Sequence, residues 1–128
     1  MQKTRRFGSP ATDILESMKY ALLICDDGSD TRSYQAINAD PRNLAFVSEL
    51  DRSDNKWVGV RLRPPTSATT IRVRDGETLV SDGPFAETKD FVGGIVIFEC
   101  ADLDEAIAIA SEHPWAHTGV IEIRPVWG

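Results

Sequence analysis

Four stretches of the chain carry the apolar patterns typical of β-strands. Residues 20–25 and 93–98 are almost continuously apolar, which predicts strands buried on both faces in the middle of a sheet. Residues 56–62 form a shorter strand pattern that ends before Pro64-Pro65, because proline cannot donate a ladder hydrogen bond. Residues 120–126 alternate apolar and polar side chains and include a proline, which favours an edge position for this last strand.

The segment after the first strand predicts a helix that begins at Pro41. Asp40 is a favoured N-cap residue, and proline is well tolerated at the first helical position. The apolar face of this helix is predicted from residues spaced three apart: Leu44, Val47 and Leu50. We expect the helix to end between residues 51 and 55.

A second helix is predicted from residue 103 onward. Asp102 with Glu105 three residues later resembles a capping box, in which side chains bond the free backbone N–H groups of the first turn. The stripe that follows has helical spacing: Leu103, Ala106, Ile107 and Ala110. Pro114 ends this helix, since proline disrupts a helix interior. Residues 30–34, by contrast, are polar and show no clear period.

Residues 71–80 carry a strong hairpin signal. Asp75-Gly76 tolerates the positive φ angles of a type I′ turn, and two strand-like runs flank it. A two-residue loop fixes the cross-strand pairs: Arg74 with Glu77, Val73 with Thr78, and Ile71 with Val80. The hairpin should therefore have one largely apolar face and an ion pair beside the turn.

The order of elements is strand, helix, strand, hairpin, strand, helix, strand, which is the split βαβ plan of a ferredoxin-like α+β fold with an antiparallel sheet and an additional hairpin. Two helices cover only one face of such a sheet. The two central strands are apolar on both faces, so a monomer would expose a sizeable hydrophobic surface. We therefore expect a homodimer that packs sheet to sheet.

Composition narrows the class of protein. With 128 residues, of which 41% are hydrophobic and 27% charged, the chain fits one globular domain. The net charge of −6 argues against direct binding to nucleic acid, which needs clustered Lys and Arg. No apolar run approaches the roughly 20 residues of a membrane helix, and residues 1–17 lack the apolar core of a signal peptide. We expect a cytoplasmic protein without membrane contact, with residues 1–17 as a flexible extension and residues 18–128 as the domain.

Two cysteines, Cys25 and Cys100, each close an apolar run, which favours buried thiols over a disulfide framework. If their strands lay side by side and parallel, the two thiols would be neighbours.

Residues 81–90, together with Gly93-Gly94, resemble the signature of the DGPF-domain proteins, a branch of the YCII-related family. Further matching segments are 18–20, 69–76, 102–106 and 121–126. The resemblance implies a dimeric α+β barrel, related in fold to muconolactone isomerases, in a group of largely uncharacterised bacterial proteins. It also implies a link to transcription, because some members accompany or are fused to sigma factors.

A His–Asp pair has been suggested as catalytic in the wider YCII group. This chain has no histidine between residues 26 and 65, where that histidine would be expected, so the pair is not carried over.

Asp82 and His113 are the candidate catalytic residues. Asp82 ends a strand before Gly83-Pro84, which would hold its carboxylate in a fixed turn, although an Asp in this position often bonds its own backbone as an Asx turn. His113 has a side chain whose ordinary pKa suits proton transfer near neutral pH. The end of the preceding helix would favour its protonated form, which is a structural alternative. His117 is a weaker candidate.

Candidate ligand-binding residues lie on the hairpin, on the signature segment and on the last strand: Arg72, Arg74, Phe85, Glu87, Lys89 and Arg124. The three arginines would form a cleft for a carboxylate or phosphate if they pointed to one side. Ion pairing with Glu77 and Glu122 is the alternative for the arginines, and a core or dimer contact is the alternative for Phe85. We predict no metal, since Pro114 separates the two histidines, and no cofactor, since no phosphate-loop or dinucleotide motif occurs.

Two functions remain open from the sequence. The first is an isomerase- or lyase-like enzyme that acts on a small polar metabolite, with Asp82 as base and His113 or an arginine assisting. The second is a non-enzymatic small-ligand-binding or protein-interaction module. A cavity in which Asp82, His113 and an arginine converge would favour the enzyme.

Overall fold

The fold is known from a computed structural model that describes residues 18–52 and 56–128. The extension predicted for residues 1–17 lies outside the described residues. The strands are β1 (Met18–Asp26), β2 (Trp57–Arg61), β3 (Thr69–Arg74), β4 (Glu77–Asp82), β5 (Phe91–Cys100) and β6 (Val120–Pro125). The helices are α2 (Tyr34–Asn38), α3 (Pro41–Arg52), α4 (Leu103–Ser111) and α5 (Pro114–Thr118), with a short 3₁₀ turn at Pro65–Ser67.

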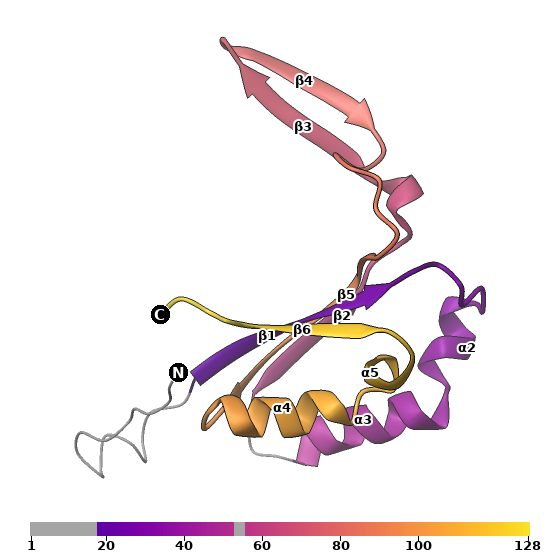
Figure 1. Cartoon of the computed structure of the whole chain (residues 1–128), viewed down its shortest axis with the longest axis vertical. Helices are drawn as coiled ribbons and strands as arrows, with labels where there is room; N and C mark the ends of the chain where they lie inside the picture. Colours follow the sequence, from indigo (N-terminus) through magenta and orange to yellow (C-terminus); the bar gives the residue numbers. More distant parts are fainter. Residues whose placement is uncertain (1–17, 53–55) are drawn as a thin grey trace.

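A four-stranded antiparallel sheet with the order β2-β5-β1-β6 forms the body of the molecule (Figure 1). The predicted ferredoxin-like α+β plan is therefore confirmed, with β1 and β5 in the centre and β6 at an edge. Because β1 and β5 are antiparallel, Cys100 pairs with Met18, while Cys25 pairs with Val92 near the opposite end of the two strands. The two thiols are therefore not neighbours, and both are free.

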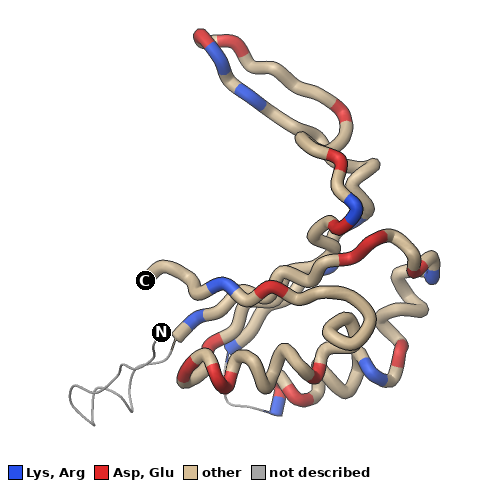
Figure 2. The backbone as a smooth tube through the Cα atoms, viewed as in Figure 1, with Lys and Arg blue, Asp and Glu red and all other residues tan. Residues whose placement is uncertain are grey.

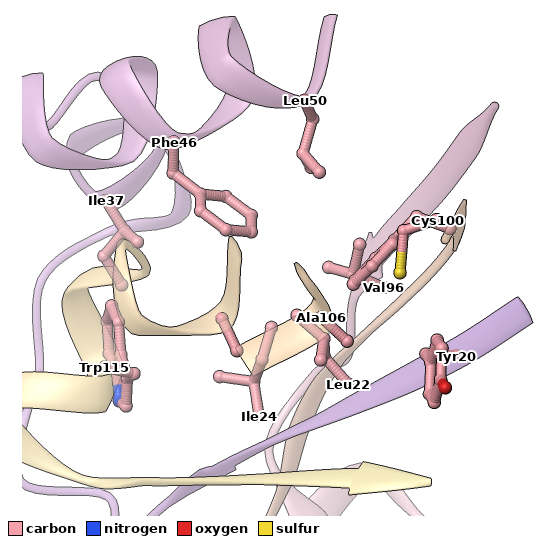
Figure 3. Close-up of a cluster of buried hydrophobic side chains, with 12 residues drawn as sticks. Tyr20, Leu22, Ile24, Ile37, Phe46, Leu50, Val96, Cys100, Ala106 and Trp115 are labelled. Atoms are coloured by element: carbon pink, nitrogen blue, oxygen red, sulfur yellow. The ribbon is translucent and has the colours of Figure 1, made fainter. Parts of the chain in front are cut away.

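All four helices cover the same face of this sheet (Figure 1). Alternate residues of the central strands point into the core between the two layers. Figure 3 shows Leu22 and Ile24 of β1 facing Ile37 and Phe46, which come from the helices. Leu22 has no exposed surface and Phe98 retains 1%. Burial of such side chains is the main source of stability, at about 25 cal/mol per Å² of apolar surface.

Helix α3 begins at Pro41, as predicted, because the Asp40 carboxylate accepts a hydrogen bond from the Arg42 backbone N–H at 2.9 Å. The predicted apolar face was wrong in part. Phe46 and Leu50, four residues apart, are its buried residues, whereas Leu44 is 52% exposed.

Helix α2 was not predicted from the sequence. It has five residues, too few to show a helical period, and it is nucleated by Ser33, whose side chain accepts from the Ala36 N–H. Its buried residue is Ile37.

Helix α4 has the capping predicted for it. The Asp102 carboxylate accepts from the Glu105 N–H at 2.9 Å, while the Glu105 carboxylate accepts from the Ala101 N–H at 2.7 Å. The helix ends at Ser111, before Pro114. Pro114 itself then starts α5, with His113 as the N-cap residue of that helix.

Strands β3 and β4 form a separate two-stranded sheet that projects from the body (Figure 1); we call residues 69–82 the arm. The predicted register is confirmed, and Asp75 and Gly76 have φ angles of 52° and 77°, as a type I′ turn requires. The expected Arg74–Glu77 ion pair does not form among the described residues, because Arg74 donates to the Val73 carbonyl instead.

The base of the arm is fixed by backbone contacts. The Gly83 N–H donates to the Ala68 carbonyl at 2.7 Å, and the Thr70 hydroxyl donates to the Gly83 carbonyl at 2.8 Å. Gly83 has a φ of 94°, a conformation that glycine adopts with little strain. Beyond this base the strands are open to solvent, and Ile71 and Val80 are each 62% exposed.

Candidate functional site

A cavity of about 180 Å³ lies on the helix-covered side of the sheet, between α2 and α3 and the strands β2 and β5. Its polar lining residues are Tyr34, Asn38, Asn43, Arg61 and His113. Apolar side chains complete the wall, among them Phe46 and Trp57. Gly59 and Gly94 also line this cavity, and neither carries a side chain that would fill it. The cavity thus combines an apolar wall with a few polar groups, as small-molecule sites do.

His113 is held in a fixed orientation at the start of α5. Its Nδ1 accepts a hydrogen bond from the Trp115 backbone N–H at 3.0 Å, and its ring packs edge-on against Phe46 with centroids 4.7 Å apart. Since Nδ1 is an acceptor, the neutral ring carries its proton on Nε2. That Nε2 makes no hydrogen bond with the described residues.

Burial decides the charge of His113. The side chain is 4% exposed, and desolvation, with a smaller effect of the Arg61 charge, lowers its pKa from the ordinary 6.5 to about 4. The sequence-based expectation of a histidine protonated at a helix end was therefore wrong. His113 is neutral at physiological pH and can act as a hydrogen-bond donor through Nε2.

Arg61 brings a positive charge to the same cavity. Its Cζ lies 5.4 Å from the centroid of the Trp115 ring, within the range of a cation–π contact. Its Nε is buried and has no hydrogen-bond partner. No carboxylate of the described residues lies within 4 Å of the guanidinium, in contrast to the arginines around it.

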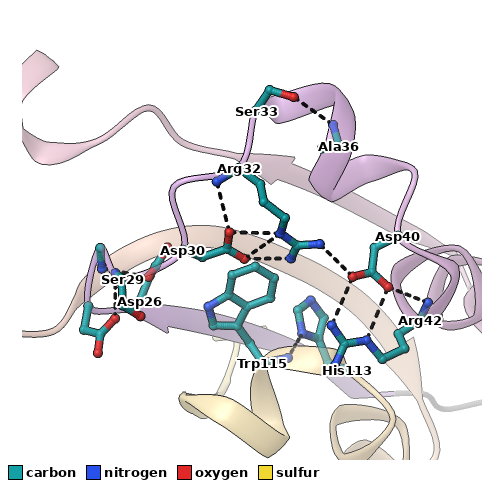
Figure 4. Close-up of polar contacts among 12 residues, drawn as sticks. Asp26, Ser29, Asp30, Arg32, Ser33, Ala36, Asp40, Arg42, His113 and Trp115 are labelled. Atoms are coloured by element: carbon teal, nitrogen blue, oxygen red, sulfur yellow. Dashed lines mark hydrogen bonds and ion pairs between the residues drawn. The ribbon is translucent and has the colours of Figure 1, made fainter.

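Those neighbouring arginines form a closed ion-pair network beside the site (Figure 4). Arg32 bridges Asp30 at 2.6 Å and Asp40 at 2.9 Å, and Arg42 contacts Asp40 at 3.0 Å. Hydrogen bonds from Arg42 and Arg32 hold the pKa of Asp40 well below its usual range. The network ties the loop after β1 to the start of α3, and so it positions the helices that form one wall of the cavity.

A second hollow of about 500 Å³ borders Trp115 and is lined by both acidic and basic side chains. Lys89 and Asp90 of the signature segment contribute to it, together with Asp26 and Arg32. Within residues 18–52 and 56–128, no three His, Cys, Asp or Glu side chains gather as a metal site would require.

The predicted site residues are spread over different parts of the molecule. His113 lines the first cavity and Lys89 lines the second hollow. The others border neither hollow: Asp82, Arg72, Arg74, Phe85, Glu87 and Arg124. Figure 2 shows the basic residues of β3 far from those of β6. The chain by itself therefore brings neither the three arginines nor Asp82 and His113 together.

Asp82 is exposed at the end of β4. Its side chain makes no hydrogen bond with the described residues, so the Asx turn considered as the structural alternative does not form. Arg124 pairs with Glu122 at 3.2 Å, which is the surface ion pair considered for it. Phe85 is 80% exposed, so it is not a core residue of its own chain.

Sequence reasoning missed Arg61, Tyr34, Asn38 and Asn43 as cavity residues. Arg61 follows the apolar part of β2, and a single charged residue in that position carries no motif. Asn38 lies on α2, which was not predicted, while Asn43 lies on α3 outside the apolar face that was predicted for that helix. One signal was available: the alternation along β2 places Trp57, Gly59 and Arg61 on the same face of the sheet.

No helix among the described residues is long and apolar enough to cross a membrane. Residues 18–128 match the YCII-related domain family. An uncharacterized protein of Rhizobium meliloti strain 1021 is 39% identical over 118 residues, which cover 85% of this chain and 92% of that protein. The match spans both the helix-covered body and the arm, and the chain belongs to the YCII-related family.

Proposed function

We propose that this YCII-related protein binds a small polar metabolite in the cavity beside His113. The observation that carries the proposal is a buried, neutral histidine with one nitrogen anchored to the backbone and the other without a protein partner. This Nε2 is not among the fully buried unpaired atoms of the described residues, so its N–H is accessible from the cavity that His113 lines, where a ligand or a water molecule can accept from it. The amides of Asn38 and Asn43 add polar groups to the same wall.

The state of His113 favours binding over strong base catalysis. A side chain with a pKa of about 4 is a poor proton acceptor at neutral pH, but its Nε2–H can polarise a carbonyl group of a ligand. An isomerase- or lyase-like reaction would need a separate base. Asp82 remains the candidate for that base from the sequence. It does not line this cavity, so its carboxylate would have to reach the ligand from outside the cavity.

A metabolite panel tests the binding proposal by thermal shift, since a ligand that binds the folded state raises the melting temperature by mass action. Asn43→Leu removes a polar lining group at similar volume and should reduce the shift. Gln35→Leu, on the exposed side of α2, should leave the shift unchanged. Equal shifts in the two variants would place the ligand elsewhere.

We propose further that the protein is a homodimer of the DGPF branch. No described helix or strand covers the face of the sheet opposite the helices. Ala21, Leu23, Val58, Val60, Ile95 and Ile97 lie there, and Val58 and Val60 are 59% and 56% exposed. The arm adds a second uncovered apolar surface, on which Ile71, Val73 and Val80 share one face.

We infer that a second copy of this chain packs against these two surfaces. An isolated two-stranded sheet is marginally stable in water, so the arm requires a packing partner. A stable interface takes roughly 20–30 residues a side, so neither the arm, with its two six-residue strands, nor the open face is large enough alone. A two-fold dimer would cover both surfaces of both copies in one closed assembly.

Light scattering at micromolar concentration tests the dimer directly. We expect twice the mass of the 14.1 kDa chain. A stable, soluble monomer would contradict the proposed dimer. The arm would then be expected to bind a different protein, as in the hypothesis of an interaction module.

A further inference from the structure

Arg61 is a charged side chain of the cavity and has no counter-ion among the described residues. Arg32, Arg42, Arg52 and Arg124 each pair with a carboxylate of the described chain. Arg61 points from β2 into the helix-covered side, where it faces Trp115 and the cavity and makes no ion pair with the described residues. The pKa of Asp30 is lowered chiefly by hydrogen bonds from Arg32, and the Arg61 charge adds a smaller effect, so this carboxylate is already held by another arginine.

The buried Nε–H of Arg61 is costly to the folded protein, although the side chain as a whole is only partly buried. A buried donor without an acceptor loses the hydrogen bond that it would make with water. The cation–π contact with Trp115 offsets only part of this loss. A charged side chain without a protein partner at a cavity is typical of a residue that binds a ligand of opposite charge.

The charge and size of the cavity restrict that ligand. Arg61 contributes one positive charge, and His113 is neutral, so the ligand that balances the site carries one negative charge. A planar carboxylate matches the fork of a guanidinium, whereas a phosphate would bring more charge than the site offsets. The volume of about 180 Å³ corresponds to roughly six water molecules, which suits an organic acid of a few carbon atoms.

We propose that Arg61 binds the carboxylate of a small organic acid in this cavity, while the His113 Nε2–H donates to a second oxygen of the same ligand. This inference rests on the proposed ligand-binding function and names the chemical class of the ligand. The two donors come from different elements, β2 and the start of α5, so the ligand would join the sheet to the helical layer. The apolar wall formed by Phe46 and Trp57 would take the carbon chain.

Propionate and propionamide provide a matched pair of probes, because they have the same shape and differ in charge. Dissociation constants are measured by ligand-observed NMR for the wild type, for Arg61→Met and for Arg63→Met. Arg63 is an exposed arginine two residues further along the chain and serves as the control. We expect propionate to bind the wild type and Arg63→Met alike, and to bind Arg61→Met about 10- to 100-fold more weakly. Propionamide should bind all three proteins weakly.

Thermal unfolding without ligand separates this role from a structural one. Removal of an unpartnered guanidinium should leave the melting temperature of Arg61→Met within a few degrees of the wild type, or raise it. A large fall in the melting temperature would overturn the proposal, because it would mark Arg61 as a stabilising residue.

The remaining outcomes distinguish this inference from the proposed function. If propionate and propionamide bind equally well, or if Arg61→Met binds propionate as well as the wild type does, then Arg61 does not bind a carboxylate. The proposed ligand-binding function would survive that result if a compound of the metabolite panel still bound in the cavity. Preference for inorganic phosphate over propionate would overturn it as well. If neither the probes nor the panel bind the wild type, both proposals fail.

Discussion

The body and the arm are both built from antiparallel strands, yet they differ in what covers them. In the body, β1 and β5 pack against helices, and Phe98 and Leu22 are almost entirely buried. In the arm, β3 and β4 follow the predicted register, and no other helix or strand of the described residues packs against either face (Figure 1). Local sequence patterns therefore predicted strands in both regions, but only the arm pairs neighbouring strands through a turn. Burial depends on a second layer, which the described part of the chain supplies for the body and not for the arm.

The largest expected effect lies in the body. Phe98→Ala should reduce the free energy of unfolding by about 3–5 kcal/mol, because it removes a ring from the packed core and leaves a cavity. Chemical denaturation measures this loss, and Val80→Ala in the arm is the matched control. At protein concentrations low enough to give monomers, the control should lose less than about 0.5 kcal/mol. A similar loss in both variants would mean that the arm packs against its own body.

Acidification should also act on the body through His113. The folded pKa of about 4 lies below the ordinary 6.5 of the unfolded chain, so the unfolded state binds the proton first as the pH falls. The contribution of neutral His113 to the free energy of unfolding is complete above pH 6.5 and is lost as the pH falls toward 4. Its total is up to about 3 kcal/mol.

Urea unfolding at a series of pH values measures this effect. His113→Asn retains an N-cap side chain and should flatten the dependence on pH in this window. His117→Asn, on the exposed side of α5, should retain it. If the free energy of unfolding of His113→Asn fell with pH as steeply as that of the wild type, the assignment of His113 as a buried neutral group would be contradicted.

The arm should respond to substitution through assembly. Ile71→Ser with Val80→Ser makes its apolar face polar, and we expect the dimer dissociation constant to rise at least about tenfold, which corresponds to 1.4 kcal/mol. Analytical ultracentrifugation measures this change. Arg72→Ser with Leu79→Ser, on the opposite face of the same strands, is the control. Equal weakening in both variants would show that the apolar face has no special role.

The smallest effect is expected at Asp82. Its side chain is exposed and has no hydrogen bond with the described residues, so Asp82→Asn should change stability by less than about 0.5 kcal/mol. It should also leave ligand binding in the cavity unchanged in a thermal-shift assay. If ligand binding falls with Asp82→Asn, then Asp82 reaches the site, and delivery from the arm of a second copy becomes the explanation to test.

The sequence was informative where local chemistry decides the structure. The Asp75-Gly76 turn, the Asp40 and Asp102 caps and the apolar runs of β1 and β5 each predicted the element that forms. It was uninformative where distant segments meet. Arg61 and His113 are 52 residues apart in number and share a cavity only because Arg61 points from β2 toward the face of the sheet that α5 covers.

The charge state of His113 illustrates the same limit. Its position before Pro114 suggested an exposed helix end, but Pro114 starts a second helix that turns the ring into the core against Phe46. Burial, which no local pattern showed, then decides that the histidine is neutral.

The central claim is that the ligand binds in the cavity of the body and not on the arm. A ¹H–¹⁵N NMR titration with propionate tests it most directly, because it reports on both regions of one sample. We predict shifts at the Arg61 side-chain Nε–H and at the backbone of His113 and Trp115, with residues 71–80 unmoved. Shifts confined to residues 71–80, or no shifts near Arg61 at saturating propionate, would contradict the account.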